Sequence, residues 1–147
     1  MPHRTPQGRG IAWVLLAAVT SGCSTAAPHF KPAEAIPPGK GVVYIYRQPR
    51  IAGSGVVGTI TANKVAIVRI RSGGYFPYIS EPGRVNFAVK SEVTDEADVN
   101  VEAGKATYLK VSIGSGFRMS QFNLSEVPLE LGSLEITECR LLPPIEP

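Results

Sequence analysis

Short apolar stretches separated by turn residues dominate the chain from residue 41 onward. Val85, Phe87 and Val89 alternate with polar or small neighbours, which is the two-residue period of a strand with one buried face. Residues 107–113 repeat this alternation, and no stretch before residue 130 has the 3.6-residue period of an amphipathic helix. The pattern therefore predicts an all-β domain.

Seven to nine short strands are predicted, at spacings of about ten residues, which favours a two-layer antiparallel β-sandwich over the alternative of an open barrel. The predicted strands are residues 41–47, 56–61, 65–70, 75–80, 85–90, 97–101, 107–113, 117–124 and 127–131. Pro128 places the last of them at a sheet edge. Residues 132–142 fit either a short helix or an extended tail.

Two turns are predicted from their residue types. Asn63 separates two strands of a hairpin and adopts the left-handed conformation readily, although Lys64 stands where Gly is usual. Pro82 and Gly83 occupy the central positions of a type II turn.

The first 22 residues have the layout of a secretory signal peptide. Arg4 and Arg9 precede an unbroken apolar run at Ile11–Val19, and the small residues Ser21 and Gly22 follow. The run is shorter than the roughly 20 residues that cross a bilayer, which disfavours a permanent transmembrane anchor.

Cys23 follows this segment, which resembles the lipobox at which bacterial lipoproteins receive diacylglycerol on the cysteine thiol. Thr20 stands where the usual residue of a lipobox is Leu. The alternative to lipidation is an ordinary signal-peptide cleavage site followed by an unmodified cysteine. Acyl chains on Cys23 would hold the protein at a membrane, since each buried CH₂ contributes about 0.8 kcal/mol. Ser24 favours the outer membrane, facing the periplasm, and a soluble periplasmic or secreted protein is the alternative.

The rest of the chain divides into three parts. Residues 23–39 contain four prolines and no apolar period, so we predict a tether that reaches tens of ångströms if extended, at about 3.1 Å per residue. Residues 40–142 form the predicted β-domain, and residues 143–147 a Pro-rich tail.

The net charge of +3 arises mostly in the leader. Of fifteen basic residues, Arg4 and Arg9 precede Cys23, which leaves thirteen against twelve acidic residues and a net charge of +1. A chain of this balance lacks the basic excess of a nucleic-acid-binding protein, so that class of partner is excluded.

Four motifs lie in order along the predicted domain. They are PPGKGVVYIYR at 37–47, GGYF at 73–76, EPG at 81–83 and VEAGK at 101–105. Together they resemble the bacterial domain family of unknown function DUF2846 over residues 37–142, with Glu81 in place of a proline and one tyrosine retained in Ala106-Thr107-Tyr108. The resemblance implies a secreted or lipid-anchored β-sandwich and supplies no activity.

Candidate chemistry is sparse. Gly53–Gly58 spells GxGxxG, but a β-branched stretch follows it instead of a helix start, which indicates a glycine loop rather than a dinucleotide site. His29, the one histidine after the leader, lies in the predicted tether. The predicted domain therefore has no histidine to act as the base for a nucleophile or as a ligand in a His/Cys zinc site. Cys139 is expected to be a buried apolar residue.

Acidic residues gather at 92–98, which we interpret as a solvated hairpin end because the glycine and final glutamate of an EF-hand loop are missing. The sequence indicates no cofactor and no metal site. Carboxylate pairs of the glycosidase type depend on spatial separation and stay open.

Aromatic residues concentrate in two strands. Alternation sends Tyr44 and Tyr46 to one face and Val43 and Ile45 to the other. An exposed tyrosine strip would be a candidate binding surface for glycan or peptide, and its residues would be Tyr44, Tyr46, Arg47, Tyr75 and Tyr78. The favoured alternative is a second buried layer, or a strip covered by the C-terminal segment.

Together these observations predict a non-catalytic, lipid-anchored protein of the bacterial cell envelope, acting as a binding or structural module with an envelope protein or glycan as partner. A glycan- or peptidoglycan-binding domain is the first alternative. A carboxylate-dependent hydrolase has the least support.

Overall fold

A computed structural model describes residues 27–32, 35–90, 93–114 and 121–146. The predicted signal peptide and Cys23 lie outside these residues. The elements are β1 (Gly41–Arg47), β2 (Gly58–Ala62), β3 (Val65–Ile70), β4 (Gly74–Ser80), β5 (Gly83–Lys90), β6 (Asp95–Val101), β7 (Ala106–Ile113), β8 (Phe122–Val127), the helix α1 (Leu129–Glu135), the 3₁₀ turn η2 (Ile136–Glu138) and β9 (Arg140–Leu141).

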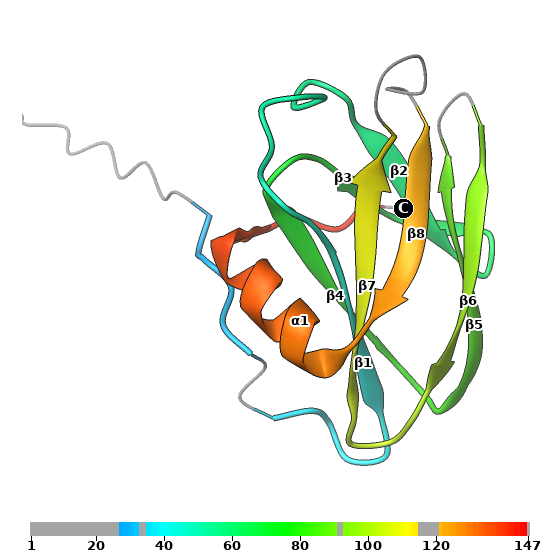
Figure 1. Cartoon of the computed structure of the whole chain (residues 1–147). Coiled ribbons are helices and arrows are strands. Elements are labelled where there is room, and N and C mark those ends of the chain that lie inside the picture. The colour runs from blue at the N-terminus through cyan, green and yellow to red at the C-terminus, as the bar shows by residue number, and fades with distance from the viewer. Residues whose placement is uncertain (1–26, 33–34, 91–92, 115–120, 147) are drawn as a thin grey trace, which may run out of the picture.

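Two packed sheets form a sandwich, as predicted (Figure 1). One sheet has the strand order β8-β7-β1-β4-β9, and the other has the order β3-β2-β5-β6. Two pairings are parallel, β1 with β7 and β4 with β9, while the others are antiparallel. Between β1 and β7 the chain passes through β2 and β3 in the second sheet, β4 in the first sheet, and β5 and β6 in the second sheet, and β7 then lies parallel to β1.

The main core lies between the sheets. Ile45, Ile60, Phe87 and Leu109 are fully buried there. Burying a side chain of this size contributes about 1.5–3 kcal/mol. The apolar side chains that alternate along 85–89 and 107–113 are therefore the ones that point into this core. Their packing positions the two sheets against each other.

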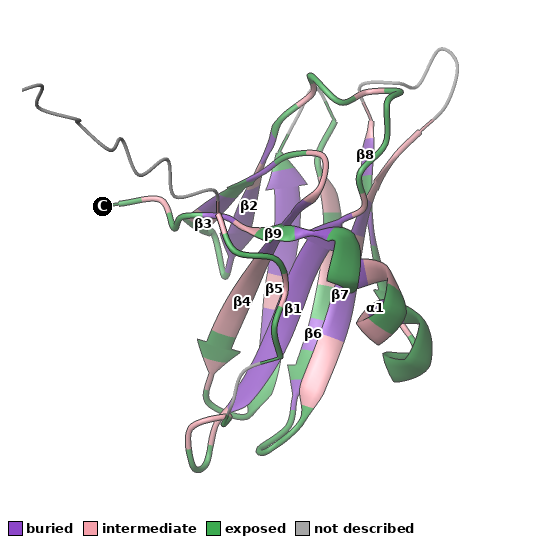
Figure 2. Ribbon diagram, turned by 90° about the vertical axis from the view of Figure 1, so that its left-hand side faces the viewer, coloured by how far each residue is buried: buried purple, intermediate pink, exposed green. Residues whose placement is uncertain are grey.

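A second buried layer covers the outer face of the first sheet. Its members are Val42, Tyr44, Tyr46, Tyr75, Tyr108, Ile136 and Cys139. Strand β1 is consequently buried along its whole length on both faces (Figure 2). The helix α1 and the N-terminal segment close this layer on the outside (Figure 1).

The C-terminal region differs from the predicted strand at 127–131. Strand β8 ends at Val127, and α1 begins directly after Pro128. Pro128 has φ −54° and lacks an N–H, so it fits a helix start, where that donor has no partner within the helix. Of the two options for residues 132–142, the helix applies as far as residue 138, and the extended strand β9 follows.

Within the described residues, the predicted tether is in contact with the domain at residues 27–30 and at Ile36, which differs from the expectation of a free linker. The Phe30 backbone N–H donates to the Cys139 carbonyl (3.0 Å), and Arg140 Nη1 donates to the Ala27 carbonyl (3.0 Å). The Phe30 ring packs edge-on against Tyr44 and Tyr75, with centroid distances of 5.2 and 5.1 Å. Aromatic side chains thus fasten this segment to the second buried layer.

Of the two predicted turns, the first has the expected left-handed residues. Asn63 has φ 47° and Lys64 has φ 71°, so the β2–β3 hairpin turns through two left-handed residues. The second predicted turn is not of type II, because Gly83 has φ 141° instead of about +80° and is already the first residue of β5. Among the described residues, no helix combines the length and apolar character needed to span a membrane.

Candidate functional site

The tyrosine strip is not an exposed surface, which corrects its candidacy as a binding face. Tyr44, Tyr46, Arg47 and Tyr75 are each at most 5% exposed. Tyr78 faces the other way and packs edge-on against Phe87 in the main core, 5.3 Å between centroids. The C-terminal segment covers the strip, as the favoured alternative predicted, and the N-terminal segment, which that alternative did not include, covers it as well.

Arg47 ends β1 and organises the glycine loop. Its Nη1 donates to the Val56 carbonyl and its Nη2 to the Gly53 carbonyl, both at 2.6 Å. The guanidinium lies 5.5 Å from the centre of the Phe122 ring, and burial lowers its pKa. The loop after Gly53 runs into strand β2 and not into a helix, so it lacks the phosphate-binding geometry of a dinucleotide site.

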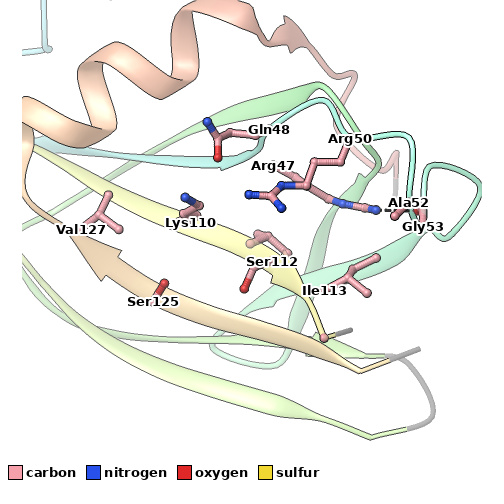
Figure 3. Close-up of a pocket in the computed structure, with 12 residues that line it drawn as sticks. Arg47, Gln48, Arg50, Ala52, Gly53, Lys110, Ser112, Ile113, Ser125 and Val127 are labelled. Atoms are coloured by element: carbon pink, nitrogen blue, oxygen red, sulfur yellow. Dashed lines mark hydrogen bonds between the residues drawn. The ribbon is translucent and has the colours of Figure 1, made fainter. Parts of the chain in front are cut away.

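A groove opens beside this loop, with a volume of about 580 Å³. The chain after β1 forms one wall, and the ends of β7 and β8 form the other (Figure 3). The lining residues are Arg47, Gln48, Arg50, Ala52, Gly53, Lys110, Val111, Ser112, Ile113, Gly114, Ser125 and Val127. The helix α1 covers the outer face of the sheet at Tyr108 and leaves the neighbouring part of β7 in the groove.

Arg50 is fixed through its backbone. Its N–H donates to Ser72 Oγ (2.9 Å), and the Ser72 hydroxyl donates back to its carbonyl (3.1 Å). Its side chain makes no hydrogen bond or ion pair within the described part of the chain. The guanidinium is therefore available at the groove.

Glu135, from the end of α1, balances one positive charge of the groove. It accepts a hydrogen bond from the Tyr46 hydroxyl (2.6 Å) and from Lys110 Nζ (2.7 Å). Burial raises the pKa of its carboxyl, but the hydrogen bonds from Lys110 and Tyr46 and the charges of Lys110 and Arg50 outweigh burial and lower it. Burial, together with Glu135, raises the pKa of the Tyr46 hydroxyl. Tyr46 is thus a neutral donor to a carboxylate.

Cys139 is fully buried and free, as expected for a structural cysteine. Its Sγ lies 3.4 Å from the Arg47 carbonyl, and burial raises its pKa to about 12. A thiol of this kind is a poor nucleophile at neutral pH.

The described acidic residues of the stretch lie in the first half of β6. Asp98 pairs with the exposed Arg84, and Asp95 accepts the Leu124 N–H at 2.7 Å. Within the described ranges, no group of three His, Cys, Asp or Glu side chains is close enough to hold a metal ion. His29 is exposed and lies opposite Arg140 in an isolated backbone bridge.

Sequence reasoning singled out Arg47 but missed Arg50, Lys110, Ser112 and Ser125. A signal was present in β7, where Lys110 and Ser112 alternate with the apolar core residues and so had to point outward. Their meeting with the chain after β1 depends on the parallel β1–β7 pairing, which local patterns do not reveal.

Comparisons with protein-family models, curated proteins and solved structures gave no match to this chain. The resemblance to DUF2846 therefore stays a prediction.

Proposed function

We propose that this protein is a non-catalytic binding module of the bacterial cell envelope, held at a membrane by acyl chains on Cys23. The single observation that carries the proposal is the docked N-terminal segment. Ala27 is hydrogen-bonded to Arg140, and Phe30 is packed on the tyrosine layer. A lipid on Cys23 would consequently be close in sequence to a segment that is fixed to the folded domain.

The spacing also limits how far the domain reaches. Three residues lie between Cys23 and Ala27, and a fully extended chain spans at most about 14 Å over the four steps from Cys23 to Ala27. The proposed module therefore sits against the bilayer surface. Its partner is reached at the membrane, and not tens of ångströms away.

Intact mass spectrometry of the protein extracted from the membrane tests the anchor. We expect a chain that starts at Cys23 and carries acyl mass, and loss of both the acyl mass and membrane retention in Cys23→Ala. Cys139→Ala is the matched control, because it removes the other cysteine and should keep the lipid. An unmodified, soluble wild-type product would refute the anchor and make this a periplasmic or secreted protein.

A glycan ligand is the second candidate function. The tyrosines do not support glycan binding, because they are buried. The groove, which is lined by charged and hydroxyl-bearing side chains, does support it.

A further inference from the structure

We propose that the groove between the chain after β1 and the ends of β7 and β8 binds an acidic sugar unit, with Arg50 and Lys110 holding the anion. The ligand class deepens the proposed binding role. It does not depend on lipidation, because every residue that carries it belongs to the folded domain.

The first argument is charge. Three cations line the groove, Arg47, Arg50 and Lys110, and one carboxylate, Glu135, forms an ion pair with Lys110 alone. Arg47 is 4% exposed, yet it forms no ion pair within the described residues and is held only by carbonyl dipoles and the Phe122 ring. Buried charges in proteins are generally paired. An anionic ligand would supply the missing charge.

The second argument is the set of neutral polar groups. Ser112 and Ser125 lie on adjacent strands in the same part of the groove, and Gln48 faces them from the wall after β1 (Figure 3). Neither serine hydroxyl makes a side-chain hydrogen bond within the described part of the chain. Hydroxyl and amide groups both donate and accept, so they match the hydroxyl groups of a sugar.

The third argument is size and construction. A volume of about 580 Å³ lies within the range of small-molecule sites. The backbone positions of these residues are fixed, because Lys110, Ser112 and Ser125 belong to paired strands and the Arg50 backbone is held by Ser72. A preformed site of this kind avoids part of the ordering cost of binding.

Carboxylate and phosphate share the anion chemistry, so the test uses both. The exported protein is purified, in detergent if it carries acyl chains. It is then titrated with glucuronate, glucose 6-phosphate, glucose and inorganic phosphate. Calorimetry gives the affinity, and amide chemical shifts at residues 48, 50–53 and 110–114 locate the site. We expect saturable binding of one acidic sugar, weakening with salt, and no comparable binding of glucose.

Arg50→Ala is the informative variant, because its side chain has no structural hydrogen bond to lose. We expect about five- to tenfold weaker binding, as for the loss of one charge-assisted contact, and no measurable binding for Arg50→Glu. Arg84→Ala, which removes an exposed arginine from the other sheet, should bind like the wild type.

Equal binding of glucose and glucuronate would overturn the role of charge, and unchanged affinity in Arg50→Glu would overturn the site. Inorganic phosphate binding as tightly as glucose 6-phosphate would overturn the sugar assignment. None of these outcomes affects the acyl mass on Cys23, so failure of this inference and failure of the anchor are distinguishable.

Discussion

Two consecutive residues in the turn between β2 and β3 have left-handed backbone angles. Asn63 is suited to this conformation and is further held by Asn86, whose N–H donates to Asn63 Oδ1 at 3.0 Å. Lys64 has φ 71° and carries a Cβ, which crowds the backbone in this region. The hairpin therefore keeps its register with one unfavourable residue in its turn.

Lys64→Gly should stabilise the protein by about 1 kcal/mol, because relief of the left-handed strain exceeds the entropy that glycine adds to the unfolded chain. Urea unfolding followed by circular dichroism measures the difference. Lys64→Ala is the control, since it removes the side chain but keeps the Cβ, and it should bring no gain. Equal stabilisation by both variants would show that charge, and not backbone strain, is responsible.

The elements of the sandwich differ in how far local sequence determines them. Strands with one buried face were predicted well, because alternation at 85–89 and 107–113 is a local property. The helix α1 left no such pattern, since Gly132 is its one buried residue and its leucines face solvent. The groove could not be predicted either, because it joins residues that only the β1–β7 pairing brings together.

Gly132 lets α1 approach β7 closely. A Cβ at this position would lie 2.4 Å from Cβ and Cγ of Tyr108, a distance that forces the helix away from the sheet. Gly132→Ala should destabilise the domain by about 1–3 kcal/mol through overpacking, although alanine favours a helix by about 1 kcal/mol over glycine. Thermal unfolding measures this.

The matched control is Gly55→Ala, where an added Cβ meets nothing within 4 Å. It should leave the stability within about 0.5 kcal/mol of the wild type. Similar losses in both variants would contradict a close approach of helix and sheet at Gly132.

Glu135 couples α1 to β1 and β7, and it gives this contact a pH dependence. Since the carboxyl pKa is lower in the folded protein than its ordinary value of 4.5, ionised Glu135 contributes stability above that pH and loses it as the pH falls through the folded pKa. Wild type should exceed Glu135→Gln by about 1–2 kcal/mol at neutral pH, and the difference should vanish in acid.

Urea denaturation of both proteins across the acidic range is the measurement. Glu130→Gln is the control, because Glu130 is exposed on the same helix. A constant difference between wild type and Glu135→Gln at all pH values would refute the contribution of the ionised carboxylate.

At the scale of the whole molecule, the two ends of the described chain meet on one face. Residues 28–30 are hydrogen-bonded to residues 139–141, and the Phe30 ring enters the tyrosine layer. The prolines of this segment predicted a linker. The sequence did not reveal the contact, because the Phe30 ring meets partners that lie far along the chain.

Phe30→Ala should release this segment and cost about 1–2 kcal/mol, as expected for a partly buried aromatic ring. Limited proteolysis, read by mass spectrometry, should show faster cleavage within residues 27–32. Lys31→Ala, at an exposed neighbouring position, should keep the wild-type rate. Unchanged cleavage in Phe30→Ala would mean that the backbone hydrogen bonds alone hold the segment.

The cover of β1 also determines when the protein can finish folding. Ribosomes make β1 early, whereas β7, α1 and Cys139, which enclose it, are made last. A nascent or truncated chain therefore carries uncovered tyrosines, the kind of surface that aggregates or recruits chaperones and proteases. Only a chain translated almost to its end can bury this surface, so incomplete chains differ from complete ones in exposing it.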